Sequence, residues 1–154
     1  MSVEVVGQGV LRRFPLRVWQ RQQQYTNDLI REFQLLTLGD QTLRHGVPGR
    51  LLDVAADFVV KYGTYSEAIM AEREAALARG EIAIDATIPL LSNTPELVGS
   101  VRTLLGEVDA FCRQGALLTL SVPGDVAALR EWTMTEMLRQ YQGQDPEPWQ
   151  GELD

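Results

Sequence analysis

Three times along the chain, a short apolar run leads to a proline and then to a long amphipathic helix pattern. The segments are Val10 to Leu36, Ile82 to Gln114 and Leu117 to Gln140, and their sequences are too dissimilar for a recognisable internal repeat. Strand-like runs followed by such helices favour a small sheet covered by helices. We therefore predict an α+β fold with about three strands and four to five helices. An all-α helical bundle is the alternative if the apolar runs near Ile84 and Leu118 are only connectors.

The first of these segments gives a strand and a helix. An edge strand is expected from Val3 to Phe14, with Gly7 and Gly9 marking a bend or bulge. Pro15 is expected at the first helical position, because a first-turn residue has no intrahelical hydrogen bond to lose. From Val18 to Leu36 the apolar positions are separated by seven, four, four and three residues, which predicts one stripe of an α-helix.

A loop and two helices are expected next. The loop covers 39–50, where glycine and proline are frequent, and a helix from Arg50 to Tyr62 follows it. The next helix is expected from Ser66 to Arg79, with Gly80 as a left-handed cap. It is rich in alanine and charged residues, and this composition predicts that it lies outside the core.

The second half begins with the clearest strand and helix signals. Glu81 to Pro89 alternates apolar and polar positions, which predicts a half-buried strand. A helix to about Gln114 should then start at Thr94, with Thr94 as its cap, Pro95 at the first position and Glu96 at the positive end of the dipole.

The last part is expected to hold a strand, a helix and an irregular segment. The strand covers Leu117 to Val122, and the helix runs from the turn at Pro123 to Tyr141. Residues 1–141 are thus expected to form a single α+β domain, followed by an irregular C-terminal segment at 142–154, called the tail below. Trp149 is the residue expected to anchor the tail.

Composition excludes several classes of protein. The 154 residues include 14 Lys and Arg against 21 Asp and Glu, a formal charge of −7 that opposes binding to nucleic acid. A single cysteine cannot form an intrachain disulfide. No window approaches the ~18 uninterrupted apolar residues that a membrane span needs, and the first ten residues lack a signal-peptide pattern. The expectation is a cytoplasmic protein that binds neither nucleic acid nor membrane.

The sequence offers little for catalysis. The single histidine, His45, lies in a loop pattern, and Cys112 lies on the apolar stripe of its helix, so neither is expected to react. One histidine and one distant cysteine cannot form a zinc site. No phosphate-binding glycine loop is present. We therefore expect no enzyme, no cofactor and no metal, although a carboxylate-based site would need a polar cleft that sequence alone does not display.

The basic residues are concentrated at the N-terminal end. Residues 1–50 hold seven Arg against four acidic residues, a local charge of +3, which leaves −10 on residues 51–154. Aromatic and guanidinium groups together are enriched at protein interfaces. The candidate partner-binding residues are Arg12, Arg13, Arg17, Trp19 and Arg21. The alternative is that Trp19 packs under the sheet and the arginines are only solvated.

One segment resembles a known ATPase family. Leu118 to Arg130 (LTLSVPGDVAALR) resembles the opening strand and helix of the anti-sigma-factor serine kinases, which have the histidine-kinase-like ATPase fold, and Val10 to Phe33 resembles it more loosely. That family binds ATP through an asparagine-bearing helix, an Asp-x-Gly-x-Gly turn and a glycine-rich lid. All three motifs are missing from this sequence, and Lys61 stands where the metal-binding asparagine would be expected. ATPase activity is therefore not carried over.

Most of the chain resembles small uncharacterised proteins of GC-rich bacteria that are encoded with the kinase, phosphatase and antagonist proteins of partner-switching regulation. The resemblance rests on Phe111 to Leu120 (FCRQGALLTL) and on the closing Pro146-Glu147-Pro148-Trp149. It implies a non-catalytic regulatory or protein-interaction module in bacterial signal transduction, with a protein partner or a second copy as ligand. A homodimer would also protect the edge and the second face of a small sheet. The alternative function is a degenerate nucleotide- or small-ligand-binding domain derived from the ATPase fold.

Overall fold

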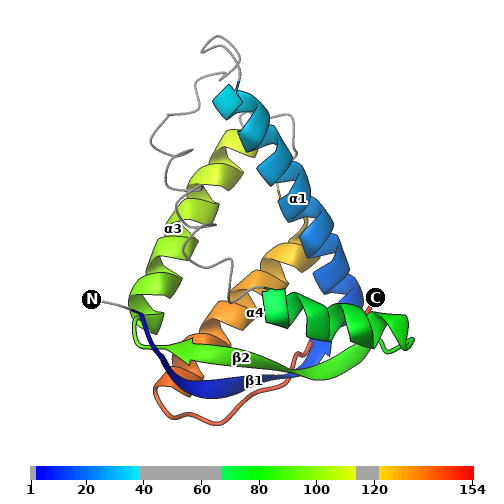
Figure 1. Cartoon of the computed structure of the whole chain (residues 1–154), viewed down its shortest axis with the longest axis vertical. Coiled ribbons are helices and arrows are strands. Elements are labelled where there is room, and N and C mark those ends of the chain that lie inside the picture. The colour runs from blue at the N-terminus through cyan, green and yellow to red at the C-terminus, as the bar shows by residue number, and fades with distance from the viewer. Residues whose placement is uncertain (1–2, 39–66, 114–121) are drawn as a thin grey trace.

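A computed structural model describes residues 3–38, 67–113 and 122–154 of the chain. Its labelled elements are β1 (Val5–Pro15), α1 (Leu16–Leu38), β2 (Ala83–Leu91), α3 (Thr94–Arg113) and α4 (Gly124–Tyr141), as Figure 1 shows. A further helix covers 67–78. The helices and the antiparallel sheet form an α+β fold, so the expected class is confirmed and the all-helical alternative is wrong.

The strands β1 and β2 pair antiparallel although more than sixty residues separate them in the chain. Gly9 lies opposite Ile88 and Leu11 opposite Ala86. The register shifts once between Val5 and Gly7 and again between Leu11 and Phe14, so the irregularity expected near Gly7 is confirmed. Because the strands run in opposite directions, α1 and α3 leave the sheet from opposite ends (Figure 1).

The boundary between β1 and α1 differs from the expectation. Pro15 is the last residue of β1, opposite Ala83, and the helix begins at Leu16. The N–H of Leu16, which has no partner within its own helix, donates to the carbonyl of Ile82 at 3.1 Å. Sheet pairing therefore extends one residue further than the proline signal predicts.

Both edges of the sheet are covered near its centre. The backbone N–H of Thr87 donates to Glu72, and both backbone polar groups of Val10 bond to the side chain of Gln140. Val10 and Thr87 lie opposite each other, so both point their backbone groups away from the sheet, as a non-hydrogen-bonded pair does. Pro89 lies two residues from Thr87, where the backbone also faces outward and its missing N–H costs no ladder bond.

The core lies between the sheet, the start of α1, the 67–78 helix and α4. Its buried members include Leu11, Phe14, Leu16, Val18, Trp19, Ala76, Ala86, Ile88, Leu90, Leu129 and Trp149. The expectation that the 67–78 helix lies outside the core is wrong, because its Ala76 is fully buried. The small alanine side chain lets this helix approach the sheet closely despite its charged composition.

The sequence predicts a cap at Gly80 and another at Thr94, and the structure has only the first. Gly80 has φ 82°, its N–H bonds to the carbonyl of Leu77, and Glu81 bonds to Ala76, which confirms a left-handed cap. The hydroxyl of Thr94 instead bonds back to the N–H and the carbonyl of Leu91. Thr94 therefore fixes the turn after β2 and does not cap α3.

The last helix and the tail follow the expectation. The helix α4 ends at Tyr141, and residues 142–154 contain no helix or strand. Trp149 is 7% exposed and belongs to the core cluster, so the predicted anchor is confirmed. The expected loop at 39–50, the helix Arg50 to Tyr62 and the strand Leu117 to Val122 lie outside the described residues, apart from Val122, which is not in a strand.

Candidate functional site

The five residues expected to form a partner-binding face do not all lie on the surface. Trp19 is 5% exposed and packs in the core, where the guanidinium of Arg73 lies 6.0 Å from its ring, so its place on the contact face is corrected. The alternative for Trp19, packing inside the molecule, is the one observed. The other four side chains are exposed, and we call Arg12, Arg13, Arg17 and Arg21 the arginine face.

Arg13 has the most unusual backbone of the arginine face. It lies within the second irregularity of β1 and has φ 55°, the left-handed region that residues with a Cβ rarely adopt. Its N–H donates to Asp85, and its Nη1 donates to the carbonyls of Trp149 and Gly151, at 3.0 Å each. A bulge re-aims a side chain, and here it directs a guanidinium onto the tail.

Arg17 and Arg21 extend the face along α1. They lie four residues apart and therefore on one side of the helix. Nη1 of Arg17 lies 2.6 Å from Oδ1 of Asp154 in the tail, whereas Nε and Nη2 of Arg21 contact Asp125 at the start of α4, each at 2.8 Å. Both ion pairs are exposed, so each contributes about 0–1 kcal/mol to stability.

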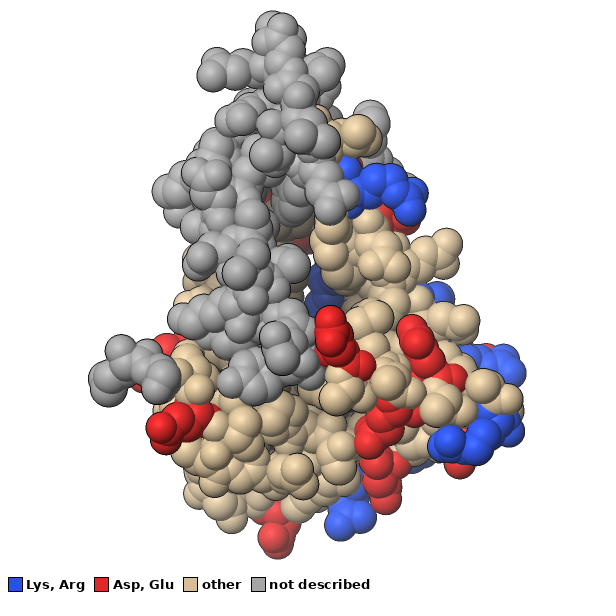
Figure 2. All heavy atoms as spheres, viewed as in Figure 1, with Lys and Arg blue, Asp and Glu red and all other residues tan. Residues whose placement is uncertain are grey.

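Arg12 contacts a different neighbour. Its Nη1 lies 3.7 Å from Asp85 of β2, and its backbone carbonyl accepts a hydrogen bond from the N–H of Trp149 at 3.0 Å. The structure thus brings Arg13, Arg17 and the backbone of Arg12 together along the tail, whereas Arg21 faces α4. In the space-filling view of Figure 2, acidic and basic side chains are interspersed over the lower right of the molecule.

The tail is anchored by an aromatic contact. The ring of Trp149 meets the ring of Trp132 edge to face, with 5.4 Å between the centroids, and Trp132 lies 6.3 Å from Phe14. The indole N–H of Trp149 donates to the carbonyl of Glu152 at 3.0 Å. The residues after Trp149 therefore fold back over its ring.

Gly151 makes this fold-back sterically possible. A Cβ at residue 151 would lie 2.5 Å from Cζ2 of Trp149, a distance that no side chain tolerates. The close approach brings the carbonyl of Gly151 to Arg13. A glycine two residues after the indole is thus part of the way the tail reaches the arginine face.

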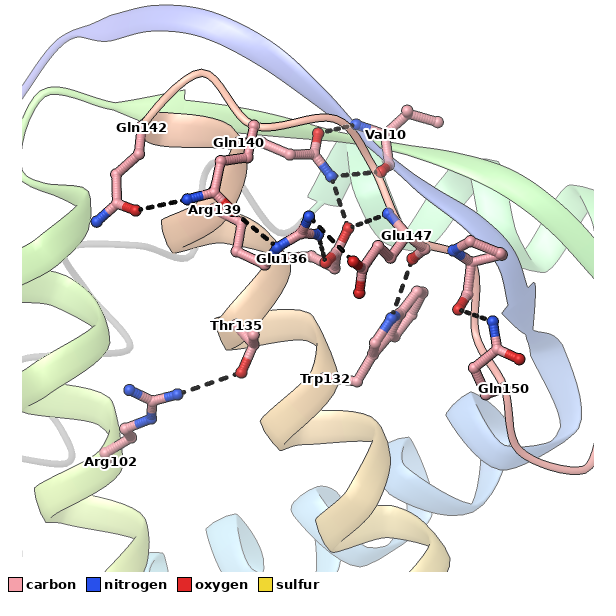
Figure 3. A network of polar contacts seen from close by, with 12 residues as sticks. Val10, Arg102, Trp132, Thr135, Glu136, Arg139, Gln140, Gln142, Glu147 and Gln150 are labelled. Carbon is pink, nitrogen blue, oxygen red and sulfur yellow. Dashed lines mark hydrogen bonds and ion pairs between the residues drawn. The ribbon is translucent and has the colours of Figure 1, made fainter.

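The start of the tail is held by the last turns of α4, as Figure 3 shows. Glu136 is 1% exposed and accepts hydrogen bonds from Arg139, from Gln140 and from the backbone N–H of Glu147. The hydrogen bond to Glu136 raises the pKa of Arg139 above its ordinary value. This buried carboxylate has three donors, so it fixes where the tail leaves α4.

A second basic feature lies inside the molecule. Arg73 is 7% exposed and stacks 4.3 Å above the ring of Phe14. Its Nε is buried without a hydrogen-bond partner, and within the described residues no carboxylate forms an ion pair with it. Burial lowers the pKa of Arg73 to about 10, an effect that the nearby charge of Glu72 partly opposes. Removing a guanidinium from water in this way costs free energy, which stacking on Phe14 opposes.

A similar shift is found between α1 and α4. Nη2 of Arg130 donates to the hydroxyl of Thr26, and its guanidinium lies 5.4 Å from the ring of Tyr25. Burial lowers the pKa of Arg130, and Tyr25 and Asp109 oppose this effect. Arg130 serves as a contact between helices rather than as part of the arginine face.

Neither a metal site nor a membrane span is found in the described ranges. No three or more His, Cys, Asp or Glu side chains there gather closely enough to hold a metal ion. None of the helices there has the length and apolar character that crossing a bilayer requires. His45 and the side chain of Cys112 lie outside what the structure describes. Comparison of the chain with family models, curated proteins and solved structures gave no match.

The sequence predicted the arginines but missed their acidic partners. Asp154 lies 137 residues from Arg17, and Asp125 lies 104 residues from Arg21, so no local pattern connects them. A usable signal was present in the tail, where acidic residues surround the single tryptophan that was expected to anchor it. Opposite charge on the two ends of the chain was therefore the clue to the contact.

Proposed function

We propose that this chain is a non-catalytic regulatory module that binds an acidic, extended segment of a protein partner through the arginine face. The observation that carries the proposal is the contact of Arg13 and Arg17 with two backbone carbonyls and one carboxylate of the tail. The face thus already accommodates a segment of this chemistry. Guanidinium groups suit such a role because their planar set of donors matches carbonyl and carboxylate oxygens.

The setting of this proposal is bacterial signal transduction in the cytoplasm. It is supported by the resemblance to proteins of partner-switching regulation and by the lack of a recognisable catalytic motif in the sequence. The proposed role requires reversible binding to another protein. Ion pairs at an exposed rim suit this role, because they steer association and set its specificity.

A capture experiment with charge-reversed bait tests the proposal. Tagged full-length chain would be incubated with extract of the source cells, and each captured protein would be quantified for the wild type and for Arg13→Glu/Arg17→Glu. We expect recovery of the specific partner to fall at least tenfold with the double variant. Arg31→Glu is the matched control, because Arg31 is an exposed arginine further along α1. Equal recovery with both variants and the wild type would contradict the proposal.

The second candidate, a degenerate nucleotide- or small-ligand-binding domain, is favoured by Arg73. A buried guanidinium whose Nε has no acceptor would gain from an anionic ligand. Titration calorimetry with ATP and ADP at millimolar concentration tests this candidate. Binding heat with the wild type that disappears in Arg73→Met would support it, and no heat with the wild type would remove it.

A further inference from the structure

We infer that the tail is a built-in copy of the ligand, which occupies the arginine face until a partner segment of the same chemistry displaces it. The inference rests on the proposed function and adds two points to it. It names the kind of segment that the partner presents, and it identifies the element that regulates access to the site.

The tail contacts the arginine face both through its backbone and through a side-chain carboxylate. Its backbone bonds the outer edge of β1 through the N–H of Trp149 and the carbonyl of Arg12. Its carbonyls at 149 and 151 bind Arg13, and its carboxylate at 154 binds Arg17. Strand-edge pairing supplies affinity in such complexes, and a side-chain pocket supplies specificity.

The seat of the Trp149 ring is aromatic, and it sets the residue that a partner must carry. The ring of Trp149 is seated against Trp132, and Trp132 also has Phe14 as a neighbour. A large flat ring buried at the centre of polar contacts is the usual anchor of a protein interface. The expected partner segment therefore has an aromatic residue in this position.

Spacing adds two further requirements. The carboxylate that binds Arg17 comes five residues after the indole, and the glycine that avoids the ring comes two residues after it. The expected partner is thus an acidic, extended protein segment that begins with an aromatic residue. It has a glycine two residues after the aromatic residue and a carboxylate five residues after it. These features come from the tail itself, which is the segment that the face is seen to fit.

The contacts of the tail also allow it to dissociate from the arginine face. Residues 142–154 contain no helix or strand, and the pairs that Arg17 makes with Asp154 and that Arg139 makes with Glu147 reach the surface. A tethered segment competes at an effective concentration on the order of millimolar. A partner must therefore bind more tightly than the tail does, or the tail must first be released.

The test uses a fluorescein-labelled peptide of residues 144–154 (QDPEPWQGELD) and fluorescence anisotropy. The proteins are the full-length wild type and two variants expected to release the tail. Trp149→Ala removes the anchor, and Gly151→Ala places a Cβ against the Trp149 ring. We expect both variants to bind the peptide at least tenfold more tightly than the wild type does. The Gly151→Ala variant keeps the test valid if Trp149→Ala fails to fold.

Two controls identify the site of binding. Adding Arg13→Glu/Arg17→Glu to the Gly151→Ala chain should reduce peptide affinity at least tenfold, whereas adding Arg31→Glu should not. A peptide carrying alanine in place of the tryptophan should bind the released chains at least tenfold more weakly. Equal affinity of the wild type and both released variants overturns the inference. A peptide affinity that Arg13→Glu/Arg17→Glu leaves unchanged also overturns the inference.

The remaining outcomes separate this inference from the proposed function. If the released chains bind the peptide but the Arg13→Glu/Arg17→Glu bait captures as much partner as the wild type, the proposed function fails and the role of the tail stands. If capture depends on the arginines but release of the tail changes nothing, only the tail inference fails. Light scattering that shows a wild-type dimer, lost in Gly151→Ala, would identify a second copy as the occupant and overturn the assignment to a different protein.

Discussion

The side-chain amide of Gln140 pairs with both backbone polar groups of Val10. Its Oε1 accepts from the N–H of Val10 at 2.8 Å, and its Nε2 donates to the carbonyl of Val10 at 2.8 Å. A side chain of α4 thus takes the place of a neighbouring strand at the outer edge of β1 (Figure 3). Unpaired strand edges invite association with other chains, so this contact both stabilises the fold and limits where a partner strand can add.

Replacement of Gln140 tests this edge contact. Gln140→Ala leaves two backbone groups of a partly buried strand without their partner, and we expect a loss of about 1–3 kcal/mol in the free energy of unfolding. Urea denaturation followed by circular dichroism measures it. Gln142→Ala is the control, because Gln142 is exposed and lies just after α4. A loss no larger than that of the control would mean that water replaces the amide at no cost.

Gly9 is predicted to couple to the same amide. A Cβ at residue 9 would lie 2.6 Å from Oε1 of Gln140 and 3.1 Å from Cγ1 of Ile88. Gly9→Ala should therefore push the amide away from Val10 and destabilise the chain by about 1–3 kcal/mol, the cost of overpacking.

A double-mutant cycle checks the origin of that cost. In the Gln140→Ala background the main clash is absent, so Gly9→Ala should cost less there than in the wild type, by at least ~0.5 kcal/mol. Gly7→Ala is the matched control in the same strand, because its Cβ would meet Leu90 at an ordinary 3.8 Å. Strictly additive effects would show that Gly9 acts through Ile88 or the backbone instead.

Local patterns predicted the elements of the fold but not their contacts. The alternation of Glu81 to Pro89 gave the strand β2, yet nothing local says that Ile88 lies opposite Gly9. Thr94 is a residue type that often caps a helix, but its hydroxyl bonds to the N–H and the carbonyl of Leu91 instead. The register of the strands depends on contacts between distant segments. The outcome at Thr94 is local, because a threonine hydroxyl can bond to nearby backbone groups in a turn instead of capping a helix.

Local sequence patterns also predicted only part of the candidate site. Arginine clustering near the N-terminal end was visible in the sequence, and four of the five expected residues are on the surface. Trp19 was misplaced on the contact face because its polar neighbours in the sequence lie on the other side of α1. The burial of Arg73 was missed because the composition of its helix suggested a solvated element.

Two glycines offer opposite tests of backbone conformation. Gly106 lies in the exposed middle of α3, where an added Cβ would meet open space, so Gly106→Ala should stabilise the chain by about 0.5–1 kcal/mol. Gly80→Ala should destabilise it by about 1 kcal/mol, because residue 80 has φ 82°. Thermal unfolding of both variants measures the difference. Equal shifts of Tm in the same direction would contradict the assigned helix boundary at Gly80.

Arg73 allows a test in which two physical effects oppose each other. Stacking of a desolvated guanidinium on an aromatic ring stabilises by about 2 kcal/mol. Burying a cation that has no ion pair within the described part of the chain, and whose Nε has no hydrogen-bond partner, costs several kcal/mol. The second effect is larger, so Arg73→Met should stabilise the chain by about 1–4 kcal/mol at pH 7. Arg79→Met is the control in the turn that follows the same helix, where the side chain is exposed and pairs with Glu81.

The pH dependence shows whether the charge causes the effect. Burial lowers the pKa of Arg73 in the folded state to about 10, below the ordinary value that holds in the unfolded chain. Below pH 10 the group is charged in both states, and the cost of burial is fully present. Above pH 10 the unfolded state binds more protons than the folded state, so the wild type gains stability as the pH rises.

The advantage of Arg73→Met over the wild type in the free energy of unfolding, measured by urea denaturation from pH 7 to 11, should therefore shrink above about pH 10. A constant advantage would assign the effect to packing, and a less stable Arg73→Met at pH 7 would show that stacking on Phe14 outweighs the burial of charge.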